Sequence, residues 1–167
     1  EVLRSMARAW EGTSARLLRE AKGAPADAGL GLVIQKMAFG VGDGESGSGV
    51  LQLVNSDTGK SQITGRYLRQ SQGRESLSDK RGALFLTRDT RGTSLEKEEP
   101  VIFKDLIKKA KLMRKKLREE MEIEFTIENG KLHILDGIRV VRRPRAAVSI
   151  AVSLAKDKII SKEEALI

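Results

Sequence analysis

The chain has 167 residues, 40% of them hydrophobic and only 4% aromatic, which is enough for one domain with a mainly aliphatic core. Its 31 Lys and Arg outnumber its 23 Asp and Glu, and the formal net charge of +8 favours a polyanionic partner such as nucleic acid. The lack of cysteine excludes disulfides, thiolate catalysis and cysteine-ligated zinc. No apolar run approaches the roughly 20 residues of a membrane span.

The first part of the chain predicts a helical segment and then short strands. Apolar residues recur with a period of about 3.6 over residues 2–21, which indicates a helix that Gly12 and Thr13 weaken in the middle. Strands and the loops between them are expected to follow. The expected loops and turns are residues 22–29, 40–49 and 55–59, and the expected strands are 30–39, 50–54 and 63–68.

The second part begins with a polar segment, residues 71–99, which predicts a long surface loop or a partly disordered region. The strongest helix signal covers residues 103–121, where one apolar stripe is expected. That stripe consists of Leu106, Ala110, Met113, Leu117 and Met121. Strands at 122–127 and 131–135 should form a hairpin around Glu128-Asn129-Gly130. A helix at 146–155 and a further helix capped by Ser161 complete the prediction.

Two segments imitate phosphate-binding loops. The glycine-rich residues 40–49 could present backbone N–H groups to a phosphate. A structural turn between strands is the more common use of such a segment, and we favour it. Thr58-Gly59-Lys60-Ser61 resembles the end of a P-loop, but the first glycine of that pattern would fall at Val54. A P-loop is therefore rejected.

A pair of carboxylates forms the first candidate site. Glu122 and Glu124 stand two residues apart on a predicted strand, so their side chains should share one face of it. Such a pair can hold Mg²⁺ together with nucleotide phosphates. The alternative, a solvated strand face, is favoured if spacing alone is considered. His133 is the only histidine and lacks a second ligand or a nucleophile, so we expect no catalysis by histidine.

Basic residues form the second candidate site. The predicted helix carries cations at helical spacing opposite its apolar stripe, and arginines crowd the segment before residue 146. A charged helix face is usually only solvated, but two basic clusters with few acids favour contact with RNA phosphates. The scarcity of aromatics argues against base stacking. The residues expected to bind RNA are Lys104, Lys108, Lys111, Lys115, Arg118, Arg142, Arg143 and Arg145.

The order of these motifs resembles the nucleotide-binding, ATP-grasp part of the pyruvate phosphate dikinase family. The most specific match is Met-Glu-Ile-Glu-Phe-Thr-Ile-Glu-Asn-Gly-Lys-Leu at residues 121–132. Further matches are residues 6–10, 31–40, 46–50, 56–59, 65–68, 71–75, 146–152 and 160–165. The resemblance implies an α/β (α+β) fold: an incomplete ATP-grasp-like domain with a mainly antiparallel sheet and flanking helices. It assigns residues 1–145 to that domain and residues 146–167 to a C-terminal helical segment.

The resemblance also identifies departures at functional positions. In the family, the residues that match Glu122 and Glu124 help to hold magnesium and nucleotide. The family's Leu-Gln-Thr-Arg stretch, whose Gln and Arg face the phosphates, is replaced by Leu135-Asp136-Gly137-Ile138, and Arg66 and Arg74 stand at acidic positions. Glu122, Glu124 and Asp136 are therefore expected to be residual nucleotide or metal positions. We expect no catalytic residue and no cofactor, with Mg²⁺ binding conceivable only at Glu122 and Glu124.

These observations lead to one functional hypothesis with two alternatives. The main hypothesis is a non-catalytic basic component of a large ribonucleoprotein assembly. The specific candidate is a mitochondrial ribosome or its assembly intermediate. Its expected partners are ribosomal RNA and neighbouring proteins, without a membrane, in the mitochondrial matrix. The first alternative is a fragment of an active, divergent dikinase that uses Mg-ATP, located in the cytoplasm or a plastid. The second is a regulatory pseudoenzyme that binds protein and not RNA.

Overall fold

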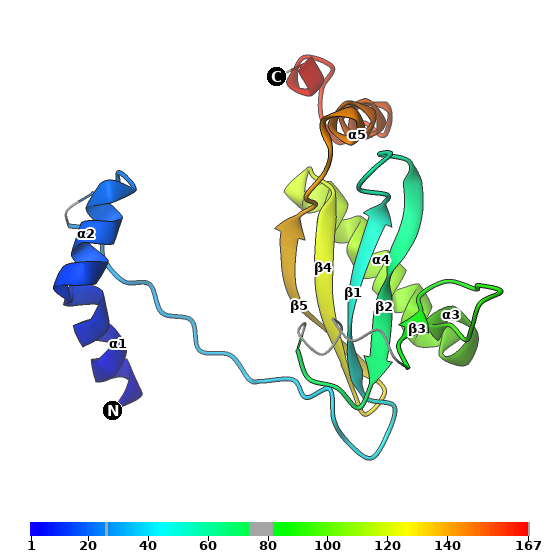
Figure 1. The fold of residues 1–167 in the computed structure, drawn as a ribbon, viewed down its shortest axis with the longest axis horizontal. Helices are drawn as coiled ribbons and strands as arrows, with labels where there is room; N and C mark the ends of the chain where they lie inside the picture. Colours follow the sequence, from blue (N-terminus) through cyan, green and yellow to red (C-terminus); the bar gives the residue numbers. More distant parts are fainter. Residues whose placement is uncertain (26, 74–81, 167) are drawn as a thin grey trace. The chain divides into compact units, whose positions relative to one another are not determined.

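The fold was analysed in a computed structural model that describes residues 1–25, 27–73 and 82–166 (Figure 1). The chain forms two compact units, Glu1–Met37 and Ala38–Ile167. Among the described residues, no helix has both the length and the apolar character needed to cross a membrane. The predicted division into an ATP-grasp-like domain, residues 1–145, and a C-terminal helical segment, residues 146–167, stays a prediction.

The first unit contains the predicted helical segment, which is divided where the sequence is weakest. Helices α1 (Val2–Glu11) and α2 (Thr13–Ala21) are separated by Gly12, whose backbone is extended. The indole N–H of Trp10 donates to the Ala28 carbonyl at 3.1 Å, and the Arg19 guanidinium lies 4.0 Å from the centre of the Trp10 ring. The Trp10 side chain thus joins the helices to the predicted loop after them.

The strand predicted for residues 30–39 is wrong. This segment has no strand assignment, and Val33 and Ile34 are 78% and 79% exposed. An alternating sequence favours a half-buried strand, but a strand also needs a neighbour that accepts its backbone hydrogen bonds. Within the described residues, no such neighbouring strand pairs with this segment.

The second unit contains an antiparallel sheet, as predicted. Its strands are β1 (Gly47–Val54), β2 (Ser61–Arg69), β3 (Leu84–Phe85), β4 (Met121–Glu128) and β5 (Lys131–Arg139). Their order in the sheet is β3-β2-β1-β4-β5, and every neighbouring pair is antiparallel. The predicted hairpin is confirmed between β4 and β5, where Asn129 and Gly130 both have positive φ. Positive φ at both central residues is the requirement of a two-residue hairpin turn of type I′.

Helix α4 (Pro100–Leu117) packs on one face of this sheet (Figure 1). The predicted helix is confirmed, but its predicted end at Met121 is wrong. The backbone of Arg118 has a left-handed conformation, with φ 59°, which ends the helix, and Met121 is already the first residue of β4. Leu117 is 53% exposed. The helix contributes to the main core, whose buried members are Leu51, Tyr67, Leu86, Leu95, Phe103, Leu106, Ala110, Ile123, Phe125 and Ile127.

Two predicted loops contain structure that composition did not reveal. The strand predicted at residues 50–54 begins earlier, at Gly47, and includes Gly49, where a Cβ would lie 2.3 Å from the Phe125 ring. Glycine there leaves room for the ring. In the predicted polar loop 71–99, Leu84 and Leu95 are buried within β3 and helix α3 (Leu95–Glu98). Residues 74–81 of that segment lie outside the described residues.

The C-terminal region consists of helix α5 (Pro144–Lys156) and the 3-10 helix η2 (Glu164–Leu166). Ile150 and Leu154 of α5 are buried with Val54 and Val140 in a second small core. The predicted cap is confirmed: Ser161 Oγ accepts from Glu164 N at 3.1 Å, and Glu164 Oε2 accepts from Ser161 N at 2.7 Å. This reciprocal pair is a capping box, although the helix that it begins is a single 3-10 turn.

Candidate functional site

The strand face opposite α4 carries the predicted carboxylate pair. Because Ile123 and Phe125 are buried in the core beside α4, the alternation of β4 directs Glu122 and Glu124 to the other face of the sheet. Gln52 of β1 donates to a carboxylate oxygen of Glu122, and neither glutamate lacks a partner. The sequence-predicted sharing of one face is therefore seen in the fold.

The cross-strand neighbours of these glutamates come from β5. Ile138 stands opposite Glu122, and Asp136 stands opposite Glu124 beside a β-bulge. Opposed residues of an antiparallel pair lie within side-chain reach, so the pair of carboxylates faces an apolar group and a third acid. Asp136 Oδ1 accepts from the backbone N–H of Gly137 at 2.7 Å. Within the described residues, no three acidic or histidine side chains converge as metal ligands would.

Three further residues singled out in the sequence are Arg66, Arg74 and His133, and the contacts of Arg66 and His133 are with neighbouring side chains of the sheet. The Arg66 guanidinium lies 3.7 Å from the centre of the Phe85 ring. Arg74 lies outside the described residues. His133 Nε2 is 3.7 Å from a carboxylate oxygen of Glu128, and His133 stands opposite Thr126 on β4. The Thr126 hydroxyl lies 3.1 Å from Ser48 Oγ, and no hydrogen bond joins it to His133 among the described residues.

The glycine-rich loop before β1 is closed by side chains of its own chain. Three of its N–H groups donate to side-chain oxygens: Gly40 to Gln72 at 2.7 Å, Gly42 to Gln70 at 3.2 Å and Gly44 to Asn129 at 3.1 Å. An N–H group that already donates to the protein is not presented to a phosphate. The geometry therefore favours the structural turn over the phosphate cradle.

The lysines of α4 are available to a partner. Lys104, Lys108, Lys111 and Lys115, which we call the lysine strip, are all exposed. None of them has an ion pair within the part of the chain that the structure describes. Arg118, predicted to belong with them, donates instead to the Ile159 carbonyl at 3.1 Å and to Glu164 at 2.5 Å. The strip is therefore a set of lysines without the arginine.

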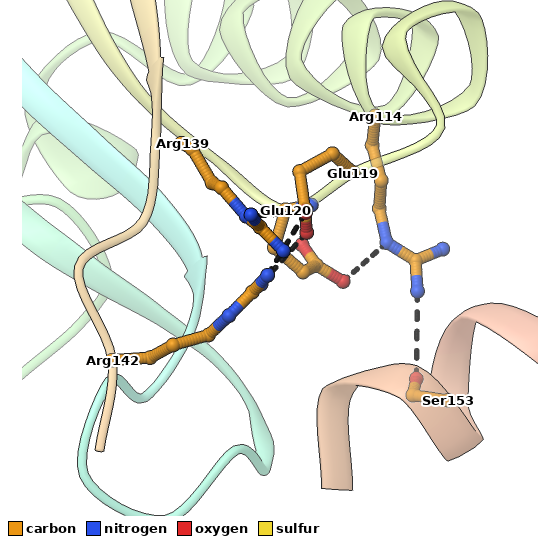
Figure 2. Close-up of polar contacts among 6 residues, drawn as sticks. All are labelled: Arg114, Glu119, Glu120, Arg139, Arg142 and Ser153. Carbon is orange, nitrogen blue, oxygen red and sulfur yellow. Dashed lines mark hydrogen bonds and ion pairs between the residues drawn. The ribbon is translucent and has the colours of Figure 1, made fainter. Parts of the chain in front are cut away.

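Two of the three arginines in the predicted cluster form ion pairs with acidic side chains of the same chain. Arg142, with a side chain only 11% exposed, donates to both carboxylate oxygens of Glu119 at 2.7 and 2.9 Å (Figure 2). Arg139 contacts the same carboxylate at 2.7 Å, and Arg143 pairs with Asp57 at 2.9 Å. Arg145 is exposed without an ion pair among the described residues. Of the three predicted arginines, Arg145 is thus the one that remains open.

A second buried pair lies beside this cluster. Arg114 of α4 contacts Glu120 at 2.5 Å, and its Nη2 lies 3.4 Å from Ser153 Oγ of α5 (Figure 2). Arg114 also contacts Asp157 at 2.8 Å. We call Arg114, Glu119, Glu120, Arg139 and Arg142 the Glu–Arg cluster. The sequence does not indicate this cluster, because Glu119 and Glu120 directly follow a basic helix and their spacing does not show which arginines they contact.

Charge within the Glu–Arg cluster shifts the ionisation of Glu119. Burial raises the pKa of this carboxyl, whereas hydrogen bonds from Arg142 and from the Glu120 backbone lower it. The charges of Arg142 and Arg139 act in the same direction, so the net pKa of Glu119 lies below its ordinary value of 4.5. The cluster therefore keeps Glu119 ionised at neutral pH.

Comparison with known proteins places the chain among one set of relatives, although it matches no protein-family model. It is 34% identical over 158 residues to the pyruvate, phosphate dikinase of Rickettsia prowazekii, covering 94% of this chain and 18% of the relative. It is 32% identical over 165 residues to that of Clostridium symbiosum, covering 99% and 18%. The chloroplastic enzyme of Flaveria trinervia is 30% identical over 138 residues, covering 83% and 14%. The chain thus spans less than a fifth of the length of these three relatives.

Proposed function

Because this chain belongs to the pyruvate, phosphate dikinase family over one segment of those proteins, we propose that it is a non-catalytic descendant of that segment that binds RNA. In this proposal the protein is a basic component of a large ribonucleoprotein assembly. A mitochondrial ribosome or its assembly intermediate is the specific case that we favour. Ribosomal RNA and neighbouring proteins would then be its partners in the mitochondrial matrix, and it would need no cofactor.

The strand face opposite α4 supports the non-catalytic part of the proposal. Phosphoryl transfer depends on positioned positive charge that stabilises the transferring group. On this face, the cross-strand neighbours of Glu122 and Glu124 are Ile138 and Asp136 on β5 and Gln52 and Val50 on β1. An isoleucine supplies no positive charge, and an additional aspartate repels an anionic substrate. The face is therefore poorly suited to transfer chemistry.

The lysine strip is the observation that carries the RNA-binding part. Its four lysines are exposed on one helix and have no ion pair within the described residues. Each lysine that contacts a phosphate releases condensed counterions, which provides affinity that depends steeply on salt and little on sequence. The strip can therefore bind an RNA backbone without reading bases.

The test is the binding of full-length protein to a structured ribosomal RNA fragment, measured by fluorescence anisotropy at increasing salt. Replacing Lys104, Lys108, Lys111 and Lys115 by Gln should reduce the slope of log affinity against log salt by about 3. A control variant removes the same charge from exposed lysines elsewhere, namely Lys22, Lys36, Lys97 and Lys131. Its slope should change by less than about 1.

Two results would overturn the proposal. Equal slopes for the two variants would mean that net charge and not the strip governs RNA binding, and absence of RNA binding would favour the regulatory pseudoenzyme. Separately, ATP consumption that requires pyruvate and phosphate can be measured with the same full-length protein. Turnover of about 1 per second or more would establish the alternative, an active divergent dikinase.

A further inference from the structure

A groove lies between α4, α5 and the ends of β1 and β2, on the α4 side of the sheet. It encloses about 650 Å³ and draws its lining from segments far apart in sequence. Its apolar lining includes Leu53, Ile63 and Ile107, and its exposed basic lining consists of Lys111, Lys115 and Lys158. We call this the α4–α5 groove. Its volume is in the range of ordinary ligand sites.

The groove has an excess of positive charge that its own acids do not neutralise. Glu120 and Asp157 also line it, but both already pair with Arg114, at 2.5 and 2.8 Å. Lys111, Lys115 and Lys158 have no ion pair within the described residues. Three lysines from two different elements therefore converge on one cavity, with their charge available to a partner.

Lys158 occupies a backbone conformation that lysine rarely adopts. Its φ is 57°, and it directly follows the C-terminal end of α5. The Ile159 N–H donates to the Leu154 carbonyl at 2.9 Å and the Lys158 N–H to the Ala155 carbonyl at 3.1 Å, a Schellman-type helix end. Glycine is the residue best suited to this position, since a side chain with positive φ is strained. A lysine at this position is therefore less stable locally than a glycine would be, but it adds a cation to the groove.

We infer that the α4–α5 groove binds the phosphate backbone of an RNA strand. The inference rests on the proposed function and locates the contact more narrowly than the whole lysine strip. Lysine is a suitable phosphate ligand as a point charge, whereas carboxylates are best recognised by the forked donors of arginine. The arginine of this groove, Arg114, is already occupied by acids, which disfavours an acidic peptide as the occupant.

The composition of the lining also indicates how the strand is held. Among the described residues, no aromatic side chain lines the groove, so they offer bases no ring on which to stack. Ser61 at the start of β2 adds an exposed hydroxyl that can donate to a phosphate oxygen. The contact should therefore be steep in salt and indifferent to base sequence.

The decisive experiment compares two triple variants of the full-length protein. The groove variant combines Lys111→Gln, Lys115→Gln and Lys158→Gly, and the control combines Lys22→Gln, Lys97→Gln and Lys131→Gln, three exposed lysines outside both the groove and the lysine strip. Glycine at position 158 removes the cation while relieving the strained φ, so lost binding cannot be attributed to unfolding. At near-physiological salt, the groove variant should bind the ribosomal RNA fragment about 30-fold more weakly and the control less than about 3-fold more weakly.

Each other outcome has a defined meaning. If the groove variant keeps wild-type affinity while the variant that replaces all four strip lysines loses it, the groove inference is wrong while the proposed RNA binding stands. If the groove variant and the control lose affinity equally, net charge governs RNA binding and both are wrong. If wild-type protein does not bind the RNA fragment, both are wrong. If poly-glutamate displaces RNA from wild-type protein at equal charge concentration and the groove variant loses poly-glutamate binding as well, the groove is an acidic-peptide site and the inference is overturned.

A second measurement locates the contact independently of affinity. Lysine acetylation by acetic anhydride can be quantified by mass spectrometry with and without bound RNA. Lys158 and Lys115 should be protected at least about 5-fold, whereas Lys97, which is exposed on α3, should not be. Protection of Lys104 and Lys108 without protection of Lys158 would overturn the groove assignment.

Discussion

Arg142 and Lys108 carry the same charge but have opposite surroundings. The side chain of Arg142 is 11% exposed and donates to both oxygens of Glu119. Lys108 is exposed and has no ion pair within the described residues. The same contrast separates neighbours on α4, because Arg114 is paired with Glu120 and Asp157 whereas Lys115 is open to a partner.

This comparison shows that a basic stretch of sequence is not by itself an anion site. Arginine presents a planar fork that matches a carboxylate, so it is readily used for internal pairing in partly buried places. Lysine is strongly hydrated and more often remains at the surface. In this chain the arginines of the Glu–Arg cluster are paired with acids, and the lysine strip is exposed without an ion pair among the described residues.

The largest expected effect comes from Arg114→Met. Loss of the guanidinium would leave Glu120, 4% exposed, as an unpaired buried carboxylate. The free energy of unfolding should fall by about 3 kcal/mol, measured by urea denaturation at neutral pH. The matched control, Lys115→Met on the same helix, should change it by less than about 0.5 kcal/mol. If both substitutions lowered the free energy of unfolding equally, the proposed difference between the Glu–Arg cluster and the lysine strip would be wrong.

A smaller effect is expected from Glu119→Gln, and it should depend on pH. The pKa of Glu119 is lower in the folded state than its ordinary value, so its ionisation stabilises the fold above about pH 4.5. That contribution is lost as the pH falls through the folded-state pKa. The variant should therefore be about 1–2 kcal/mol less stable than wild type at neutral pH, with the difference shrinking near pH 3.

Urea titrations of both proteins at the two pH values provide this measurement. Glu164→Gln is a useful comparison, because that carboxyl also has a lowered pKa but lies at the surface, bonded to the Ser161 backbone and Arg118. A difference between wild type and Glu119→Gln that stays constant with pH would show that shape and not charge explains the effect.

The smallest effect is expected at Arg143, and it tests whether burial makes the difference. Arg143 pairs with Asp57, but the two side chains are 76% and 65% exposed. Arg143→Gln should change the free energy of unfolding by less than about 0.5 kcal/mol, since exposed pairs contribute little. Arg142→Gln, one residue earlier, should cost about 1–2 kcal/mol in the same urea titration. The reverse order would contradict the assigned roles.

Much of the fold follows from local sequence. The hairpin around Asn129 and Gly130 was predictable because the turn needs positive φ at adjacent positions. The register of α4 was predictable from Leu106 and Ala110, which are both buried. The segment at residues 30–39 was not, because a strand is defined by a partner and its own alternation cannot supply one.

The candidate site was predictable only in part. The shared face of Glu122 and Glu124 follows from the two-residue period of a strand. Their facing of Ile138 and Asp136 depends on the register of β4 against β5, including its bulge. The pairing of Arg142 with Glu119 joins residues 23 positions apart, so no local pattern reports it.

The sequence by itself determined the family, the antiparallel character of the sheet and the helical spacing of the α4 lysines. Each of these follows from motifs or residue spacing within short segments of the chain. The tertiary structure decided which cations remain available. Packing of α5 beside the end of α4 brings Asp157 to Arg114 and Lys158 to the groove shared with Lys111 and Lys115. Whether a charge is neutralised or available depends on which side chains meet across the fold, and distances between remote segments are set by packing.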